Sequence, residues 1–145
     1  MRAIPGIVAL ALLVGACQQP AELKVEDAWV RLPAVAGRPG AAYFTIQGGD
    51  TPDTLLAVAT RAALRVELHE TSDQNGLKAM RPIRDVAIPA AGTVAFAPGG
   101  KHVMLFDLGP NVKAGERIPL ALSFAGGKRL EVQAMVVGAG EMPPK

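Results

Sequence analysis

The sequence has 145 residues, a formal net charge of +2 and a hydrophobic fraction of 50% with few aromatic side chains. This length predicts one domain with a modest core. The charges are scattered without a basic run, which excludes the electrostatic pattern of a nucleic-acid-binding protein. Cys17 is the single cysteine, so an internal disulfide is excluded as well.

Residues 1–16 have the pattern of an export signal. Arg2 supplies the positive start, and the apolar run at 7–14 is too short to span a bilayer as a mature helix. Small residues precede Cys17, so this stretch resembles a bacterial lipobox. We therefore predict that residues 1–16 are a lipoprotein signal peptide and that lipidated Cys17 anchors the protein to a membrane. The alternative is an ordinary signal peptide with an incidental cysteine.

The rest of the chain is predicted to be all-β. Residues 17–22 are expected to be a lipidated tether, 23–138 the folded domain and 139–145 a flexible tail. Short runs rich in β-formers alternate with breaks rich in glycine and proline, which is typical of an antiparallel sandwich or small barrel. The expected strands are 25–31, 42–46, 55–59, 65–70, 77–80, 83–88, 93–97, 102–108, 118–124 and 129–137. Single helical turns are expected at 61–63 and 113–116.

Both histidines and two of the methionines follow one another as His-x10-Met-x21-His-x-Met, at His69, Met80, His102 and Met104. Thioethers select Cu(I) among first-row metals, and imidazole also accepts copper, so this set predicts a Cu(I) site. His102 and Met104 are two residues apart on a predicted strand, so their side chains share a face. From geometry alone, a coincidental surface cluster remains an equal alternative.

Several other side chains have two interpretations. Trp29 and Tyr43 could line a metal pocket, although core packing is the expected role of such aromatics. Met135 is expected in a strand core, and Met142 in the tail could at best be a weak extra ligand. Glu70 and Asp73 beside the first histidine could orient it, or could belong to a solvated loop; the loop is our expectation.

Nothing in the sequence indicates an enzyme. No serine, cysteine or aspartate stands at a spacing from either histidine that suggests nucleophilic catalysis. No glycine-rich phosphate loop follows a predicted strand.

The spacing resembles the signature of the PCu(A)C family, periplasmic copper chaperones with a cupredoxin-like fold. The resemblance covers nearly the whole mature chain and includes Ala28-Trp29-Val30-Arg31, Val66-Glu67-Leu68-His69-Glu70 and Pro98-Gly99-Gly100-Lys101-His102-Val103-Met104-Leu105. It departs from the family at Gln47-Gly48-Gly49 and at Lys78-Ala79, neither of which touches a predicted ligand.

This resemblance implies a cupredoxin-like antiparallel Greek-key β-sandwich or barrel. It implies that His69, Met80, His102 and Met104 bind Cu(I), and that the copper is delivered to the copper-site subunit of cytochrome c oxidase or to a thiol relay protein. The expected location is the periplasm or the outer face of the cell envelope, with the protein a monomer anchored through Cys17.

Two other functions stay open. A copper electron-transfer protein of related fold is one, although blue-copper sites need a cysteine thiolate beside two histidines and Cys17 lies far from the motif. The other is a lipoprotein interaction module without metal, in which the histidines and methionines form a surface patch.

Overall fold

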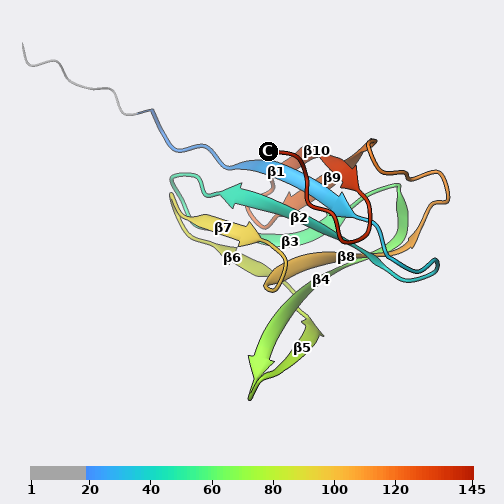
Figure 1. Cartoon of the computed structure of the whole chain (residues 1–145). Coiled ribbons are helices and arrows are strands. Elements are labelled where there is room, and N and C mark those ends of the chain that lie inside the picture. Colours follow the sequence, from blue (N-terminus) through green and yellow to red (C-terminus); the bar gives the residue numbers. More distant parts are fainter. Residues whose placement is uncertain (1–18) are drawn as a thin grey trace, which may run out of the picture.

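The computed structural model describes residues 19–145, and within this range it contains ten strands and no helix (Figure 1). The all-β prediction is therefore confirmed for the described chain. The strands are β1 Lys24–Arg31, β2 Gly40–Gln47, β3 Asp53–Ala59, β4 Ala63–Gln74, β5 Leu77–Pro82, β6 Val86–Ile88, β7 Thr93–Phe96, β8 Lys101–Leu108, β9 Arg117–Phe124 and β10 Arg129–Val137. Residues 19–145 thus contain no helix that is long and apolar enough to cross a membrane.

The ten strands form one mixed sheet in the order β5-β4-β8-β7-β2-β1-β10-β9-β3-β6, with an additional pairing of β8 to β2. Most neighbours are antiparallel, as expected, but β1 pairs with β10 and β7 with β8 in parallel. The sheet ends in a projecting hairpin, β4 with β5, that extends away from the body of the domain (Figure 1).

The main core lies on the inner face of this sheet. Alternating residues of the central strands point inward and are fully buried, including Val30, Ile46, Val103, Leu105 and Leu122. Burying each such side chain stabilises the fold by about 1.5–3 kcal/mol. None of the four predicted copper ligands belongs to this core.

A second, smaller cluster covers the outer face of the same central strands. Trp29 and Tyr43 are opposite each other on β1 and β2, with ring centroids 4.5 Å apart, and pack with Val137 and Met135. Both aromatics are buried, which agrees with the packing role expected for them. Arg31 lies over both rings, 5.1 Å and 5.6 Å from their centroids, in cation–π geometry.

Two local predictions need correction. The strand expected at 83–88 begins only at Val86, because the Ile83 amide still bonds to the Leu68 carbonyl of β4, at 2.9 Å, and the chain must then cross to pair with β3. The helical turns expected at 61–63 and 113–116 are not helical: Ala63 already belongs to β4. Gly115 has a φ of 90°, in the left-handed region, which interrupts a right-handed turn there.

The ends of the domain are attached to its body. Ala21 donates to Asp50 Oδ1 at 2.7 Å and accepts from the Asp50 amide at 3.1 Å, so the chain is fixed two residues before the predicted boundary at 23. In the tail, Arg31 donates to the Glu141 carbonyl at 3.2 Å and to Met142 Sδ at 3.3 Å. The predicted signal peptide and Cys17 lie outside the described residues.

Candidate metal centre

The turn at Asn75-Gly76 sets the position of the first two candidate ligands. Both residues have positive φ, 56° and 81°, which is the type I′ geometry that Asn-Gly favours in two-residue hairpins. Asp73 Oδ1 accepts from the Gly76 amide at 2.8 Å and holds the turn. The resulting register places Met80 opposite Thr71, so Met80 lies on the same face of the hairpin as His69.

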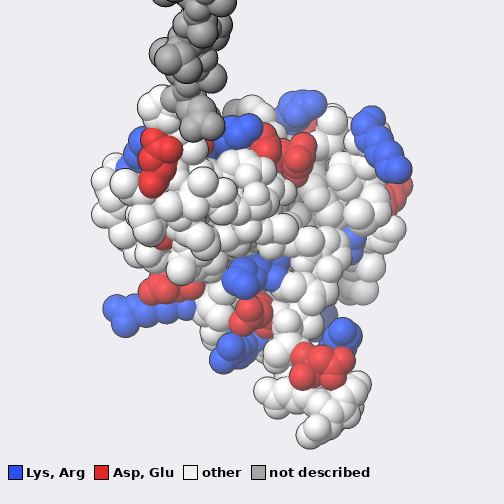
Figure 2. Space-filling model, turned by 90° about the vertical axis from the view of Figure 1, so that its left-hand side faces the viewer, with Lys and Arg blue, Asp and Glu red and all other residues white. Residues whose placement is uncertain are grey.

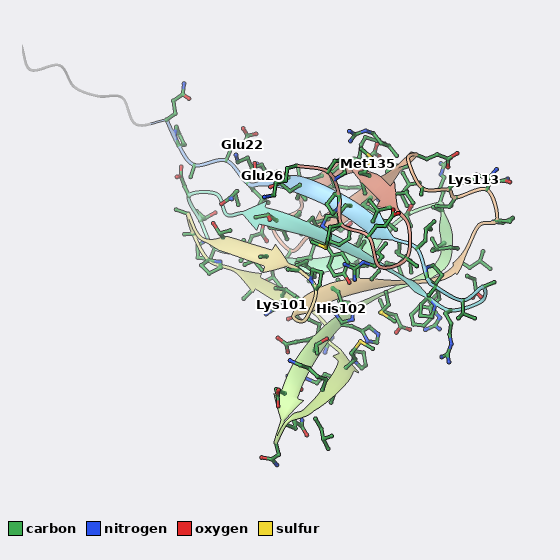
Figure 3. All side chains as sticks on the ribbon, in the orientation of Figure 1. Glu22, Glu26, Lys101, His102, Lys113 and Met135 are labelled. Atoms are coloured by element: carbon green, nitrogen blue, oxygen red, sulfur yellow. The ribbon has the colours of Figure 1, made fainter. Side chains whose placement is uncertain are left out.

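Pairing of β4 with β8 brings in the other two candidate ligands. His69 is directly opposite His102, with ring centroids 5.9 Å apart. Met104 follows His102 by two residues and therefore points to the same face. All four side chains thus share one face at the base of the projecting hairpin, where Figure 3 labels His102.

Among the described residues, each imidazole has one nitrogen engaged and one nitrogen without a hydrogen-bond partner. His102 Nδ1 is 2.9 Å from the Gly100 carbonyl, and His69 Nε2 is 2.9 Å from Glu67 Oε2. A carbonyl and a carboxylate only accept, so these two ring nitrogens donate. Within residues 19–145, the remaining nitrogens, His69 Nδ1 and His102 Nε2, are buried and have no hydrogen-bond partner. Such atoms are costly to bury unless a ligand uses their lone pairs.

The ligand face is partly open to solvent. His102 is 5% exposed and the His69 side chain 13%, whereas Met80 is 62% exposed. A groove of about 490 Å³ is lined by Met80, His102 and Met104 together with Tyr43. A larger groove of about 700 Å³ between Leu32, Leu64 and Val112 contains none of the predicted ligands.

The carboxylate that contacts a histidine is Glu67, which the sequence analysis did not select. Its hydrogen bond with His69 is the main cause that lowers the pKa of Glu67 below its ordinary value, and Arg65 contributes. The sequence could have indicated this contact, since Glu67 and His69 are two residues apart and residues at that spacing on a strand share a face. Glu70 points to the other face and pairs with Lys101 and Arg81, each at 3.2 Å, which lower its pKa.

Arg31 is a second residue that the sequence analysis missed. It lines the groove beside Tyr43, and its guanidinium binds the tail at Met142, while Ala139 and Gly140 line the same groove. The charges of the visible face are mixed, with acidic and basic side chains interspersed and no continuous patch of one sign (Figure 2).

The arrangement suits a soft metal ion better than a hard one. Within residues 19–145, no three His, Cys, Asp or Glu side chains come together in a group that could hold a metal. The same face carries the thioethers of Met80 and Met104 beside the two imidazoles. Two neutral nitrogens and two thioether sulfurs favour Cu(I).

Comparison with known proteins finds lipoprotein relatives of this chain. A family model described as "LpqE-like: Putative lipoprotein LpqE-like" matches residues 23–136. The "Putative lipoprotein Lxx21020" of Leifsonia xyli subsp. xyli is 33% identical over 116 residues, which are 79% of this chain and 69% of that protein.

Solved structures show the same fold. The solution structure of Cu(I)-bound DR1885 from Deinococcus radiodurans has a TM-score of 0.62 and 32% identity, covering 86% of this chain and 83% of that one. The copper-bound PCuAC domain from PmoF2 has a TM-score of 0.67 and 23% identity, covering 83% and 97%. The predicted cupredoxin-like fold is confirmed by these likenesses.

Proposed function

Because this chain belongs to the LpqE-like family and shares the fold of PCuAC copper-chaperone domains, we propose that it is a Cu(I) chaperone of the cell envelope. The copper is its cargo, and the protein is not an enzyme. The proposed ligands are His69, Met80, His102 and Met104.

One observation carries this proposal: two buried imidazole nitrogens that have no hydrogen-bond partner in the described part of the chain lie on the face that also bears two thioethers. A polar atom buried without a partner costs about 1–3 kcal/mol. Two such atoms in one cross-strand pair are better explained by a ligand that accepts both lone pairs than by packing. Cu(I) is that ligand because the other donors on the face are thioether sulfurs.

Exposure of Met80 supports transfer rather than storage. Copper held by three partly or fully covered donors and one exposed thioether can be approached by a partner from the side of Met80. A neutral His₂Met₂ set has no anionic sulfur, so cysteine thiolates of an acceptor should bind copper more tightly. We propose as acceptor the copper-site subunit of cytochrome c oxidase or a thiol relay protein.

The proposed location is supported by the N-terminal sequence and by the lipoprotein relative. We propose that residues 1–16 are removed and that lipidated Cys17 holds the domain at the periplasmic or outer face of a membrane. Residues 23–138 would then act as a monomeric domain.

The two other functions remain distinguishable. Blue-copper electron transfer needs a thiolate ligand, and the chain's only cysteine is Cys17, outside the domain. A metal-free interaction module would give no ligand to the two buried imidazole nitrogens. No observation on the described residues favours either of these functions over copper transport.

The test is a competition for Cu(I) against a chelator, using residues 17–145 with Cys17→Ser. We expect the domain to hold Cu(I) and His102→Ala to lose most of that affinity. Met135→Leu is the matched control for the thioethers, because Met135 packs against the Trp29 cluster and not in the groove. A domain that cannot hold Cu(I) against the chelator would instead support the interaction module.

Transfer is tested by mixing the loaded domain with a reduced, empty acceptor that carries cysteine thiolates and following copper by mass spectrometry. Copper should move to the acceptor. Copper that stays on this protein at equilibrium would contradict the chaperone function while leaving copper binding intact.

A further inference from the structure

The two histidines of the metal centre are held by different kinds of group. His102 Nδ1 donates to a backbone carbonyl, that of Gly100, which no side-chain substitution removes. His69 Nε2 donates to a side chain, Glu67 Oε2, at 2.9 Å. The free nitrogen is therefore Nε2 in His102 and Nδ1 in His69. The orientation of His69 alone depends on a residue that can be exchanged.

Glu67 is itself held in place by a short chain of contacts. Its second oxygen, Oε1, pairs with the Arg65 guanidinium. That guanidinium lies over the ring of Phe106, 3.7 Å from the centroid, and Phe106 is opposite Arg65 in the β4–β8 register. A chain of contacts on the ligand face thus runs from Phe106 through Arg65 and Glu67 to His69. Each carboxylate oxygen of Glu67 has one of these partners.

We propose that Glu67 is a positioning residue for copper: it keeps the proton of His69 on Nε2 and so presents the Nδ1 lone pair to the metal. This inference rests on the proposed copper site. Glu67 does not touch the metal, and Arg65 stacked on Phe106 keeps the carboxylate in the orientation that His69 requires. The site is then asymmetric, with copper bound by Nδ1 of His69 and by Nε2 of His102.

Two physical effects follow from such a partner. A carboxylate that accepts from one ring nitrogen fixes the tautomer and the ring plane, so the imidazole does not need to reorient when metal arrives. It also keeps the lone pair of the other ring nitrogen directed toward the metal. Loss of partners of this kind costs roughly 10–100-fold in metal affinity in other proteins.

The neighbouring Glu70 provides a matched control. It lies on the same strand, is also in salt bridges, and is one residue from His69, but it points to the opposite face toward Lys101 and Arg81. Glu67→Ala and Glu70→Ala therefore remove the same group from two faces of β4. Glu67→Gln adds a conservative variant, since its amide oxygen can still accept from Nε2 although the charge is gone.

The first measurement uses the metal-free protein and NMR of the imidazole nitrogens at mildly alkaline pH. We expect the Nε2–H tautomer of His69 in the unaltered protein and in Glu70→Ala, and a mixture of tautomers in Glu67→Ala. A His69 tautomer that does not change in Glu67→Ala would overturn the proposal. Because no copper is present, this result is independent of whether the protein binds copper at all.

The second measurement is Cu(I) affinity by chelator competition. We expect a loss of roughly 10–100-fold in Glu67→Ala, a smaller loss in Glu67→Gln and less than about twofold change in Glu70→Ala. Circular dichroism of each variant should show the same β content. Equal losses in Glu67→Ala and Glu70→Ala would show a general charge or stability effect and would contradict a positioning role for Glu67.

Discussion

His69 and His102 are opposite each other in the β4–β8 register, with ring centroids 5.9 Å apart. A different nitrogen of each ring has no hydrogen-bond partner among residues 19–145. The pair forms only because residues 33 positions apart in the sequence meet in an antiparallel ladder. Each histidine alone would be an ordinary, largely covered side chain. Together with Met80 and Met104 they make a soft donor set on one sheet face.

The first prediction concerns the turn that places Met80. Gly76 has a left-handed φ of 81°, so Gly76→Val should destabilise the hairpin by about 1–2 kcal/mol. A one-residue slip of register would send Met80 to the other face. We therefore expect weaker Cu(I) binding by chelator competition. Gly127→Val is the control, because Gly127 has a similar φ of 91° between β9 and β10, far along the chain from the ligands. An equal loss of copper affinity in both variants would refute the role of the turn.

The second prediction concerns oxidation state. Met80→Leu and Met104→Leu keep the apolar bulk and delete sulfur, so each should weaken Cu(I) binding by roughly tenfold or more, which is about 1.4 kcal/mol. Cu(II) prefers nitrogen and oxygen ligands, so its affinity should change much less. Separate competition titrations for the two ions, with Met135→Leu as control, measure this difference. If both ions lost affinity to the same degree, the thioethers would not be what selects Cu(I).

The third prediction concerns alkaline stability. Burial raises the pKa of Tyr43 above its ordinary value of 10.0, with Arg31 acting in the opposite direction. The folded state therefore favours the neutral phenol. This contribution to stability is complete below pH 10 and is lost as the pH rises through the folded-state pKa.

Urea denaturation at a series of alkaline pH values should show this loss in the unaltered protein and less of it in Tyr43→Phe. Comparison of the two removes the effect of lysine titration in the same range. Tyr43 is the only tyrosine, so its absorbance reports the titration directly. A free energy of unfolding that falls identically in both proteins would show that Tyr43 is not responsible.

The fourth prediction separates membrane attachment from copper binding. Cys17→Ser removes the proposed lipidation residue and leaves all four proposed ligands in place. The variant should appear in the soluble fraction and bind Cu(I) as tightly as the unaltered domain. Continued membrane partition of a variant shown to be processed would point to another anchor.

Much of the fold could be predicted from the sequence because its signals are local. Runs such as Ala42-Tyr43-Phe44-Thr45-Ile46, bounded by glycine and proline, form strands where expected. The Asn75-Gly76 turn also follows from its own two residues. The parallel pairing of β1 with β10 could not be predicted, because it joins segments from opposite ends of the chain.

The same distinction applies to the site. His102 and Met104 share a face by their spacing, and so do Glu67 and His69, although the significance of Glu67 emerges only when its carboxylate is seen against the ring. Arg31 reaches the groove through pairing of β1 with β2 and through contact with the tail. Neither long-range contact has a local sequence signal.

X-ray absorption spectroscopy of the Cu(I)-loaded domain tests the proposed ligand set, because it identifies the atoms bound to copper. We expect both nitrogen and sulfur scatterers, with the sulfur contribution reduced in Met80→Leu and in Met104→Leu and unchanged in Met135→Leu. A copper environment without sulfur, or a sulfur contribution that neither Met80→Leu nor Met104→Leu reduces, would contradict it.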